Sequence, residues 1–201
     1  MITKRWVKRS FPPRDFHEEI GLPYFHAHLL YNRGIRDLIS LKAFRSSERS
    51  SCYDPSLLPN MEKGVIRILS AIRSKENIAI FGDFDTDGIT GTALLIRALT
   101  DLGIRVIPYI PDRVDEGHGL NREAIQLLYT QGVSLIITVD CGATSVEEVE
   151  LASDLGIDTI VTDHHVMTDE APRAHAIINP NHPKSKYPYI YLTGVGMSFK
   201  L

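Results

Sequence analysis

The feature of this sequence that most constrains its fold is the alternation of strand-like and helix-like segments after residue 77. Short apolar runs are separated by longer segments of helical character. The expected strands cover residues 78–81, 104–110, 134–139 and 157–161, and the expected helices cover residues 90–102, 121–129 and 145–155. Each helix is long enough to cross back over a sheet, so the strands should be parallel and their connections right-handed. The sequence therefore predicts an α/β fold, with a parallel β-sheet and helices on both faces.

The first 77 residues lack this alternation and are expected to form a helical N-terminal region. Apolar residues recur at helical spacing after Asn60, whose side chain should accept from free N–H groups of the first turn. A capping box is expected further along the chain, where Glu148 follows Ser145 by three residues.

Two parts are thus expected, a helical region over residues 1–77 and an α/β domain over residues 78–201. The last segment, from Thr193 to Leu201, has the pattern of a helix start without a closing signal. The domain is therefore expected to be truncated at its C-terminal end, and the chain to be a fragment of a longer protein.

Composition favours a globular protein and decides little about partners. The 201 residues are 43% hydrophobic and 23% charged. No apolar run approaches the ~20 residues of a membrane span, and no signal-peptide core is present, so a cytoplasmic location is expected. Cys52 and Cys141 are too few for a disulfide framework. The net charge of −3 argues weakly against nucleic acid, but a bound metal would hide part of the negative charge.

Clusters of acids and histidines follow the expected strands. They are Asp83-Phe84-Asp85-Thr86-Asp87-Gly88, Asp140-Cys141-Gly142 and Asp163-His164-His165. Because the carboxyl ends of parallel strands border one crevice, these side chains can meet in space. Carboxylates without Lys or Arg between them repel one another and need a cation. The pattern therefore predicts a metal-dependent hydrolytic site.

The first cluster has three readings. An EF-hand loop that began at Asp83 would need a glutamate at its twelfth position, where this chain has Leu94. A single Asp would suffice to cap the next helix. In extended backbone, residues two apart point the same way, so Asp85 and Asp87 are expected to face one ion.

The other two clusters differ in specificity. Asp140 is either an ordinary loop residue or a metal ligand, and Cys141 is expected to be a small buried residue because oxygen-rich surroundings suit Mn²⁺ or Mg²⁺ better than a thiolate. His164 and His165 are adjacent, so their side chains diverge, and one can bind metal while the other faces substrate. Arg113, in a glycine-bearing loop at another strand end, is either solvated or holds a phosphate. No Gly-x-Gly-x-x-Gly run marks a dinucleotide site.

Together, and in this order, the three clusters resemble the motifs of the DHH phosphoesterase family. Flanking segments add to the resemblance and favour its bacterial branch of single-strand-specific 5′→3′ exonucleases. These segments are Asp54-Pro55, the run from Pro111 to Gly117, Asn179-Pro180 and the run from Leu192 to Leu201.

The resemblance implies roles for individual residues. It implies four metal ligands, Asp85, Asp87, Asp140 and His164. Asp83 would lie beside them as a ligand or a supporting group, and Asp163 would orient the histidine pair. His165 would contact the scissile phosphate, and Arg113 would help to hold the substrate. The ions would be Mn²⁺ or Mg²⁺, two of them in the complete protein.

The same resemblance implies single-stranded DNA as substrate, a role in DNA repair and recombination, and single-strand-binding protein and a helicase as partners. His118 departs from the family, which often has Tyr at this position. A fourth motif with a further metal-binding Asp is absent from the chain, as are a second catalytic domain and an OB-like domain, so the fragment alone is expected to be weak or inactive. The alternatives are an oligoribonuclease, a cyclic-dinucleotide phosphodiesterase, a pyrophosphatase or a non-catalytic replication scaffold.

Overall fold

The chain forms two compact units, Met1–Cys52 and Tyr53–Leu201. The computed structural model describes residues 7, 9–46, 52–168 and 170–201. The division expected from the sequence, into residues 1–77 and 78–201, has its border later in the chain than that between the two compact units. This expected division remains a prediction. In the part of the chain that is described, no helix is both long and apolar enough to cross a membrane.

The second unit is built on a five-stranded parallel sheet with the strand order β2-β1-β3-β4-β5. Its strands are β1 Asn77–Gly82, β2 Val106–Tyr109, β3 Val133–Val139, β4 Asp158–Thr162 and β5 Ala176–Ile178. Four of them lie where the alternation predicted strands, whereas the short β5 was not predicted. The expected α/β class with a parallel sheet is confirmed.

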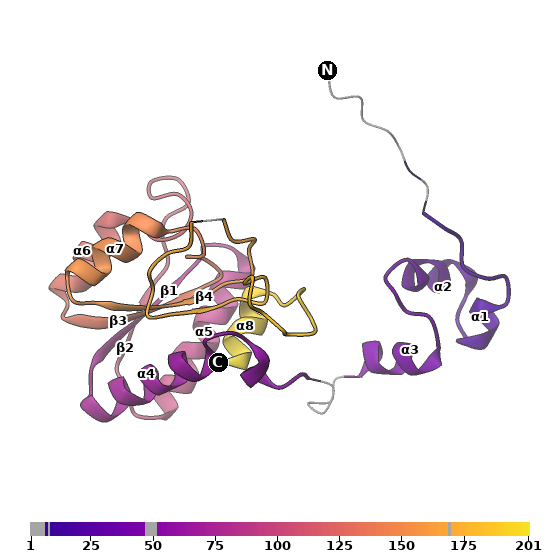
Figure 1. Cartoon of the computed structure of the whole chain (residues 1–201), viewed down its shortest axis with the longest axis horizontal. Helices are drawn as coiled ribbons and strands as arrows, with labels where there is room; N and C mark the ends of the chain where they lie inside the picture. Colours follow the sequence, from indigo (N-terminus) through magenta and orange to yellow (C-terminus); the bar gives the residue numbers. More distant parts are fainter. Residues whose placement is uncertain (1–6, 8, 47–51, 169) are drawn as a thin grey trace, which may run out of the picture. The chain divides into compact units, whose positions relative to one another are not determined.

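Helices cover both faces of this sheet (Figure 1). One face carries α4 Met61–Ser74, α5 Thr86–Asp101 and α8 Gly194–Lys200, and the other carries α6 Arg122–Thr130 and α7 Val146–Asp154. Strand residues alternate between the two cores: Ile78 and Ile80 join the first, and Ala79 and Phe81 join the second. Because side chains of a strand point alternately to the two faces, a strand buried on both sides must be apolar throughout.

The order of the strands brings the three clusters together. β1, β3 and β4 are neighbours, and each is followed at once by an aspartate. The ladder continues past the strand ends, where the Asp83 N–H donates to the Val139 carbonyl (3.1 Å) and the Asp140 N–H donates to the Thr162 carbonyl (3.0 Å). Asp83, Asp140 and Asp163 therefore stand side by side along one edge of the sheet.

Two predicted helix caps are wrong, although the helices begin where expected. Asn60 precedes α4 but has a φ of 59°, and its side-chain amide donates to the Ile177 carbonyl (3.0 Å) rather than capping the helix. Ser145 precedes α7 with a ψ of 66°, and its side chain makes no capping bond, so the box with Glu148 does not form. A capping side chain, whether amide or hydroxyl, normally needs extended backbone to reach the N–H groups of the first turn.

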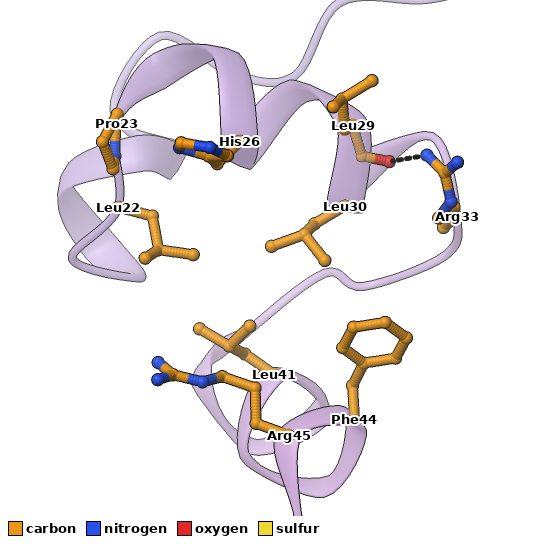
Figure 2. Close-up of a pocket in the computed structure, with 9 residues that line it drawn as sticks. All are labelled: Leu22, Pro23, His26, Leu29, Leu30, Arg33, Leu41, Phe44 and Arg45. Carbon is orange, nitrogen blue, oxygen red and sulfur yellow. Dashed lines mark hydrogen bonds between the residues drawn. The ribbon is translucent and has the colours of Figure 1, made fainter.

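The N-terminal unit is a small helical cluster. Its helices are α1 Phe16–Glu19, α2 Tyr24–Tyr31 and α3 Leu38–Arg45. The hydrophobic cluster of this unit consists of Phe16, Ala27 and Leu41 from the helices and Ile20 and Ile35 from the segments that follow α1 and α2. A pocket of about 540 Å³ lies between α2 and α3, with Leu29, Leu30 and Phe44 among its lining residues (Figure 2). This lining is mainly apolar and contains no carboxylate.

Candidate metal centre

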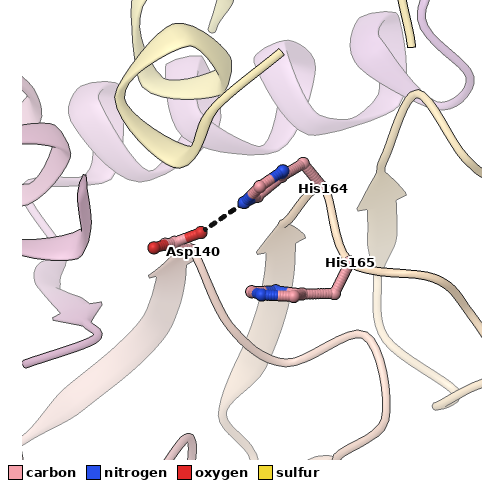
Figure 3. Close-up of side chains that lie close together, drawn as sticks. All are labelled: Asp140, His164 and His165. Atoms are coloured by element: carbon pink, nitrogen blue, oxygen red, sulfur yellow. Dashed lines mark ion pairs between the residues drawn. The ribbon is translucent and has the colours of Figure 1, made fainter. Parts of the chain in front are cut away.

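Asp140 is the centre of the acidic site. Two sets of side chains offer donor atoms within 4.8 Å of one another: Asp83, Asp85 and Asp140 form one set, and Asp140, His164 and His165 form the other. Figure 3 shows Asp140 at the end of β3, with the two histidine rings reaching toward it from the segment after β4. Because Asp140 belongs to both sets, the structure offers two adjacent positions for a cation.

The Asp140 carboxylate is buried without full compensation. Its Oδ1 lies 3.0 Å from His164 Nε2, yet the two atoms are not aligned for a hydrogen bond, and this oxygen has no hydrogen-bond partner. Burial, together with the charges of Asp87 and Asp85, raises the pKa of Asp140 to about 7. A neighbouring cation would reverse this shift, since opposite charge favours the carboxylate.

Asp83 shows the same pattern at the end of β1. It is 2% exposed, and its Oδ1 has no hydrogen-bond partner although His118 Nδ1 lies 2.9 Å away. Sequence reasoning noted His118 only as a departure from the family and missed this contact. The signal that could have found it is the position of the histidine in a loop that follows β2, at the same edge of the sheet.

These residues fit a divalent cation. Two buried carboxylate oxygens lack partners, and among the described residues no Lys or Arg lies within ion-pair distance of the clustered aspartates. Buried polar groups are normally satisfied, and an orphaned one needs an explanation such as an ion. Carboxylate oxygens combined with imidazole suit Mn²⁺.

Asp85 reaches the site differently from the prediction. We expected extended backbone over Asp85 and Asp87, but α5 already begins at Thr86. Asp85 is the cap of this helix, and its Oδ1 accepts from the Asp87 N–H (2.8 Å) and the Gly88 N–H (3.0 Å). The short polar side chain satisfies free N–H groups of the first turn, and it remains in the set with Asp83.

Asp87 lies beside these two sets without belonging to either. Its Oδ2 is 3.8 Å from His164 Nε2, which is within ligation reach of a shared ion. Its oxygens also accept from the Gly194 N–H (2.5 Å) and the Val195 N–H (2.8 Å) at the start of α8. A carboxylate has about four lone-pair sites, so these bonds leave capacity for a metal.

Asp163 holds the histidine pair through several bonds. Its Oδ1 accepts from the backbone N–H of His164 (2.7 Å) and of His165 (3.1 Å) and lies 2.7 Å from His165 Nδ1, while Oδ2 accepts from the Ala143 N–H (2.9 Å). Burial lowers the pKa of His165, but the hydrogen bond to Asp163 and the charges of nearby aspartates outweigh burial and raise it.

Two asparagines support the same segment from behind, and sequence reasoning gave them no role in the site. The side-chain amide of Asn179 donates to the His165 carbonyl (3.0 Å), and that of Asn181 donates to the His164 carbonyl (2.6 Å). Asn179 is fully buried. Its place in the Asn179-Pro180 step was the only available signal.

Arg113 and Cys141 occupy the margins of the site. The exposed Arg113 guanidinium lies 5.3 Å from the centre of the Phe84 ring, so it is next to the first cluster but is not among the grouped carboxylates. Cys141 is buried, and burial raises the pKa of its thiol well above the ordinary value. This agrees with the expectation of a small buried residue.

Comparison with known proteins gives a consistent result. Residues 77–201 match the sequence model described as "DHH family, N-terminal domain". The single-stranded-DNA-specific exonuclease RecJ of Bacillus subtilis (strain 168) is 40% identical over 184 residues, covering 92% of this chain and 23% of that protein. The protein of the same name from Escherichia coli (strain K12) is 40% identical over 173 residues, covering 83% of this chain and 30% of that protein.

Solved structures agree with the sequence relatives. RecJ of Thermus thermophilus in complex with Mn²⁺ is 28% identical, with a TM-score of 0.70 over 96% of this chain and 27% of that one. A structure of the same protein in complex with Mg²⁺ has a TM-score of 0.53 and 26% identity over 96% of this chain and 23% of that one. This chain thus spans less than a third of each of these relatives. Since the family match covers more than half of its residues, the chain belongs to the DHH family.

Proposed function

We propose that this chain is the N-terminal catalytic part of a RecJ-like 5′→3′ exonuclease, which hydrolyses phosphodiesters of single-stranded DNA with Mn²⁺ or Mg²⁺. The observation that carries the proposal is that Asp83, Asp140 and His164 meet at the strand ends, where Asp83 and Asp140 each have a buried carboxylate oxygen without a partner among the described residues. The names of the relatives supply the substrate class. These relatives are much longer than the matched segment, so the proposal concerns the share of the reaction that this chain's residues perform.

The metal-binding role falls to residues at the ends of β1, β3 and β4. We assign it to Asp83, Asp85, Asp87, Asp140 and His164. Divalent ions in such a site supply an activated water and neutralise charge on the phosphate oxygens. The protein positions the donors: the sheet aligns the aspartates, and Asp163 with the two asparagines fixes the histidine segment.

We assign substrate contacts to His165 and Arg113. His165 has its Nδ1 engaged by Asp163, and its raised pKa favours a positively charged ring that can contact a non-bridging phosphate oxygen. The Arg113 fork is free of carboxylate partners within ion-pair distance among the described residues and suits a phosphate. Both roles are predictions that mutagenesis can test. We also propose single-strand-binding protein and a helicase as partners, a part in DNA repair and recombination, and a cytoplasmic location.

The experiment that tests this function compares substrates with the natural polypeptide that contains this chain. A 5′-labelled single-stranded DNA should release its labelled nucleotide at the start of digestion in Mn²⁺, and it should be cleaved faster than duplex DNA and faster than dinucleotides. Asp87→Ala or His164→Ala should abolish cleavage while circular dichroism shows a retained fold. Faster cleavage of dinucleotides than of long single-stranded DNA would favour another phosphodiesterase of the family instead.

A non-catalytic scaffold makes a different prediction for metal binding. The proposed enzyme should bind Mn²⁺ in calorimetry, and chelation should reverse both binding and cleavage. Lys184→Ala, which changes a residue in the loop after β5 that contacts none of the grouped carboxylates, serves as the control and should retain activity. Absence of Mn²⁺ binding by the wild-type protein would refute the enzymatic assignment.

A further inference from the structure

We infer that His118 is an additional metal ligand at the position formed by Asp83, Asp85 and Asp140, and that it makes this position select Mn²⁺ over Mg²⁺. The inference rests on the proposed metal site and extends it to a residue that none of the three acidic motifs contains. It assigns a function to a histidine in the loop between β2 and α6.

The first argument is a distance without a hydrogen bond. His118 Nδ1 lies 2.9 Å from Asp83 Oδ1, but this buried oxygen has no hydrogen-bond partner. Two donors that each lie about 2.1 Å from one ion, at right angles, are about 3 Å apart. The separation suits either a hydrogen bond or two neighbouring ligands of one cation, and the absence of a hydrogen bond to Asp83 Oδ1 among the described residues favours the ligands.

A second pair in the same site has the same form. His164 Nε2 lies 3.0 Å from Asp140 Oδ1, and that oxygen also lacks a hydrogen-bond partner. The site thus contains two imidazole–carboxylate pairs, one at the end of β1 and one at the end of β3. Among the grouped donors, His164 and His165 belong with Asp140, whereas His118 approaches the other cation position through Asp83.

The loop that carries His118 is built to hold it in place. Gly117 and Gly119 have φ values of 81° and 82°, which allow the chain to turn on both sides of the histidine. Glu116 accepts from the Asp112 N–H (2.9 Å) and from the Asn121 side chain (2.9 Å), so the loop is tied to its own start and to α6. His118 therefore lies in a turn whose position is fixed by hydrogen bonds of Glu116.

The surroundings of the ring leave it open toward the site. Its centre lies 5.4 Å from that of Phe84 and 6.3 Å from that of His165. The His118 side chain is 60% exposed, and it borders a cavity of about 330 Å³ that is also lined by Asp140 and Asp163. The His118 ring thus borders the cavity and also lies beside Asp83.

The chemistry of the added donor determines selectivity. Mg²⁺ prefers oxygen ligands and sheds water reluctantly, whereas imidazole is a good ligand for transition metals. An imidazole added to three carboxylates should therefore strengthen Mn²⁺ binding and leave Mg²⁺ binding nearly unchanged.

The test replaces the donor and keeps the ring. In His118→Phe, an aromatic side chain remains beside Phe84, but no nitrogen is left. Calorimetry should show Mn²⁺ affinity reduced by about tenfold or more and Mg²⁺ affinity changed by less than about twofold. Electron spin echo modulation of bound Mn²⁺ should lose one of its imidazole nitrogen couplings. His118→Asn should behave in the same way.

His175→Phe is the matched control. His175 is also an imidazole beside an aspartate, with its Nδ1 3.9 Å from Asp158 Oδ1, but Asp158 begins β4 and so lies at the opposite edge of the sheet. This variant should leave the Mn²⁺/Mg²⁺ affinity ratio and the spectrum unchanged.

The outcomes separate this inference from the proposed function. If wild-type protein binds Mn²⁺ and His118→Phe keeps the same affinity ratio and the same nitrogen couplings, His118 is no ligand while the metal site stands. If the wild-type protein binds neither ion, both the metal site and the role of His118 are overturned.

Discussion

Two of the cavities in the described part of the chain differ in nearly every respect. The pocket of the N-terminal unit is the larger, about 540 Å³, and apolar side chains of α2 and α3 dominate its lining. The cavity at the edge of the sheet is about 330 Å³ and is lined by Asp140, Asp163 and two histidines. Of these two cavities, only the smaller is lined by a residue with a buried carboxylate oxygen that lacks a partner among the described residues, which is Asp140. The comparison teaches that unsatisfied buried carboxylate oxygens, rather than cavity size, point to the candidate metal centre.

The largest effect should come from Asp140, which both cation positions share. Asp140→Asn should reduce Mn²⁺ affinity by more than ~100-fold, since changes merely next to metal ligands already cost 10–100-fold. The same variant should raise the melting temperature of the metal-free chain, because it removes a buried charge. Calorimetry and thermal unfolding in a chelator measure the two effects. Asp154→Asn, at an exposed position in α7, is the control; equal Mn²⁺ affinity in both variants would contradict the site.

A core substitution in the N-terminal unit should have the opposite effect: it should lower stability and leave Mn²⁺ affinity unchanged. Leu41 is 3% exposed and also lines the apolar pocket. Leu41→Ala should destabilise this unit by about 2–5 kcal/mol, with Mn²⁺ affinity unchanged. Hydrogen exchange of α1 to α3 measures the first effect and calorimetry the second. Leu29→Ala changes a side chain of the same pocket that is 41% exposed and should cost less. A loss of Mn²⁺ binding in Leu41→Ala would break the distinction between the two regions.

Mn²⁺ binding by the acidic region should depend on pH. With its pKa at about 7, Asp140 in the folded metal-free chain keeps a proton that the unfolded chain releases near pH 4. Its stabilising contribution is therefore complete below about pH 4 and lost as pH rises through about 7. Metal must displace this proton, so Mn²⁺ affinity should fall by up to about tenfold per unit below pH 7. Mn²⁺ titrations at about pH 6 and pH 8 test this, and a flat profile would argue against Asp140 as a ligand.

The smallest predicted effect concerns Ser145, which borders the acidic cavity without capping its helix, in contrast to Asn121, which caps α6. Ser145 borders the acidic cavity but makes no capping bond, so Ser145→Ala should change stability by less than about 0.5 kcal/mol and leave Mn²⁺ affinity intact. Asn121 caps α6 through a 2.7 Å bond from the Ala124 N–H, and Asn121→Ala should cost about 1 kcal/mol. Urea unfolding measures both, and equal losses would show that Ser145 supports its helix after all.

Sequence periodicity predicted the elements that position the site because parallel strands buried on both faces must be apolar throughout. The aspartates after β1, β3 and β4 were therefore recognisable in advance. Details that depend on one backbone angle were not: Asn60 adopts a positive φ, and Asp85 caps a helix that begins at Thr86 rather than at residue 90. The contact between His118 and Asp83 depends on how a loop folds across the sheet edge, for which local sequence carries no period.

The contact between Asp87 and the start of α8 links the arrangement of the acidic cluster to the order in which the chain is translated. Its carboxylate receives the N–H groups of Gly194 and Val195, and a side chain at position 194 would come within 2.6 Å of the Asp140 carboxyl carbon. Ribosomes make the chain from its N-terminus, so the aspartates and histidines are all present before this last helix is translated. A nascent chain that has not yet released α8 from the exit tunnel therefore lacks the two N–H groups that hold the Asp87 carboxylate in the finished fold.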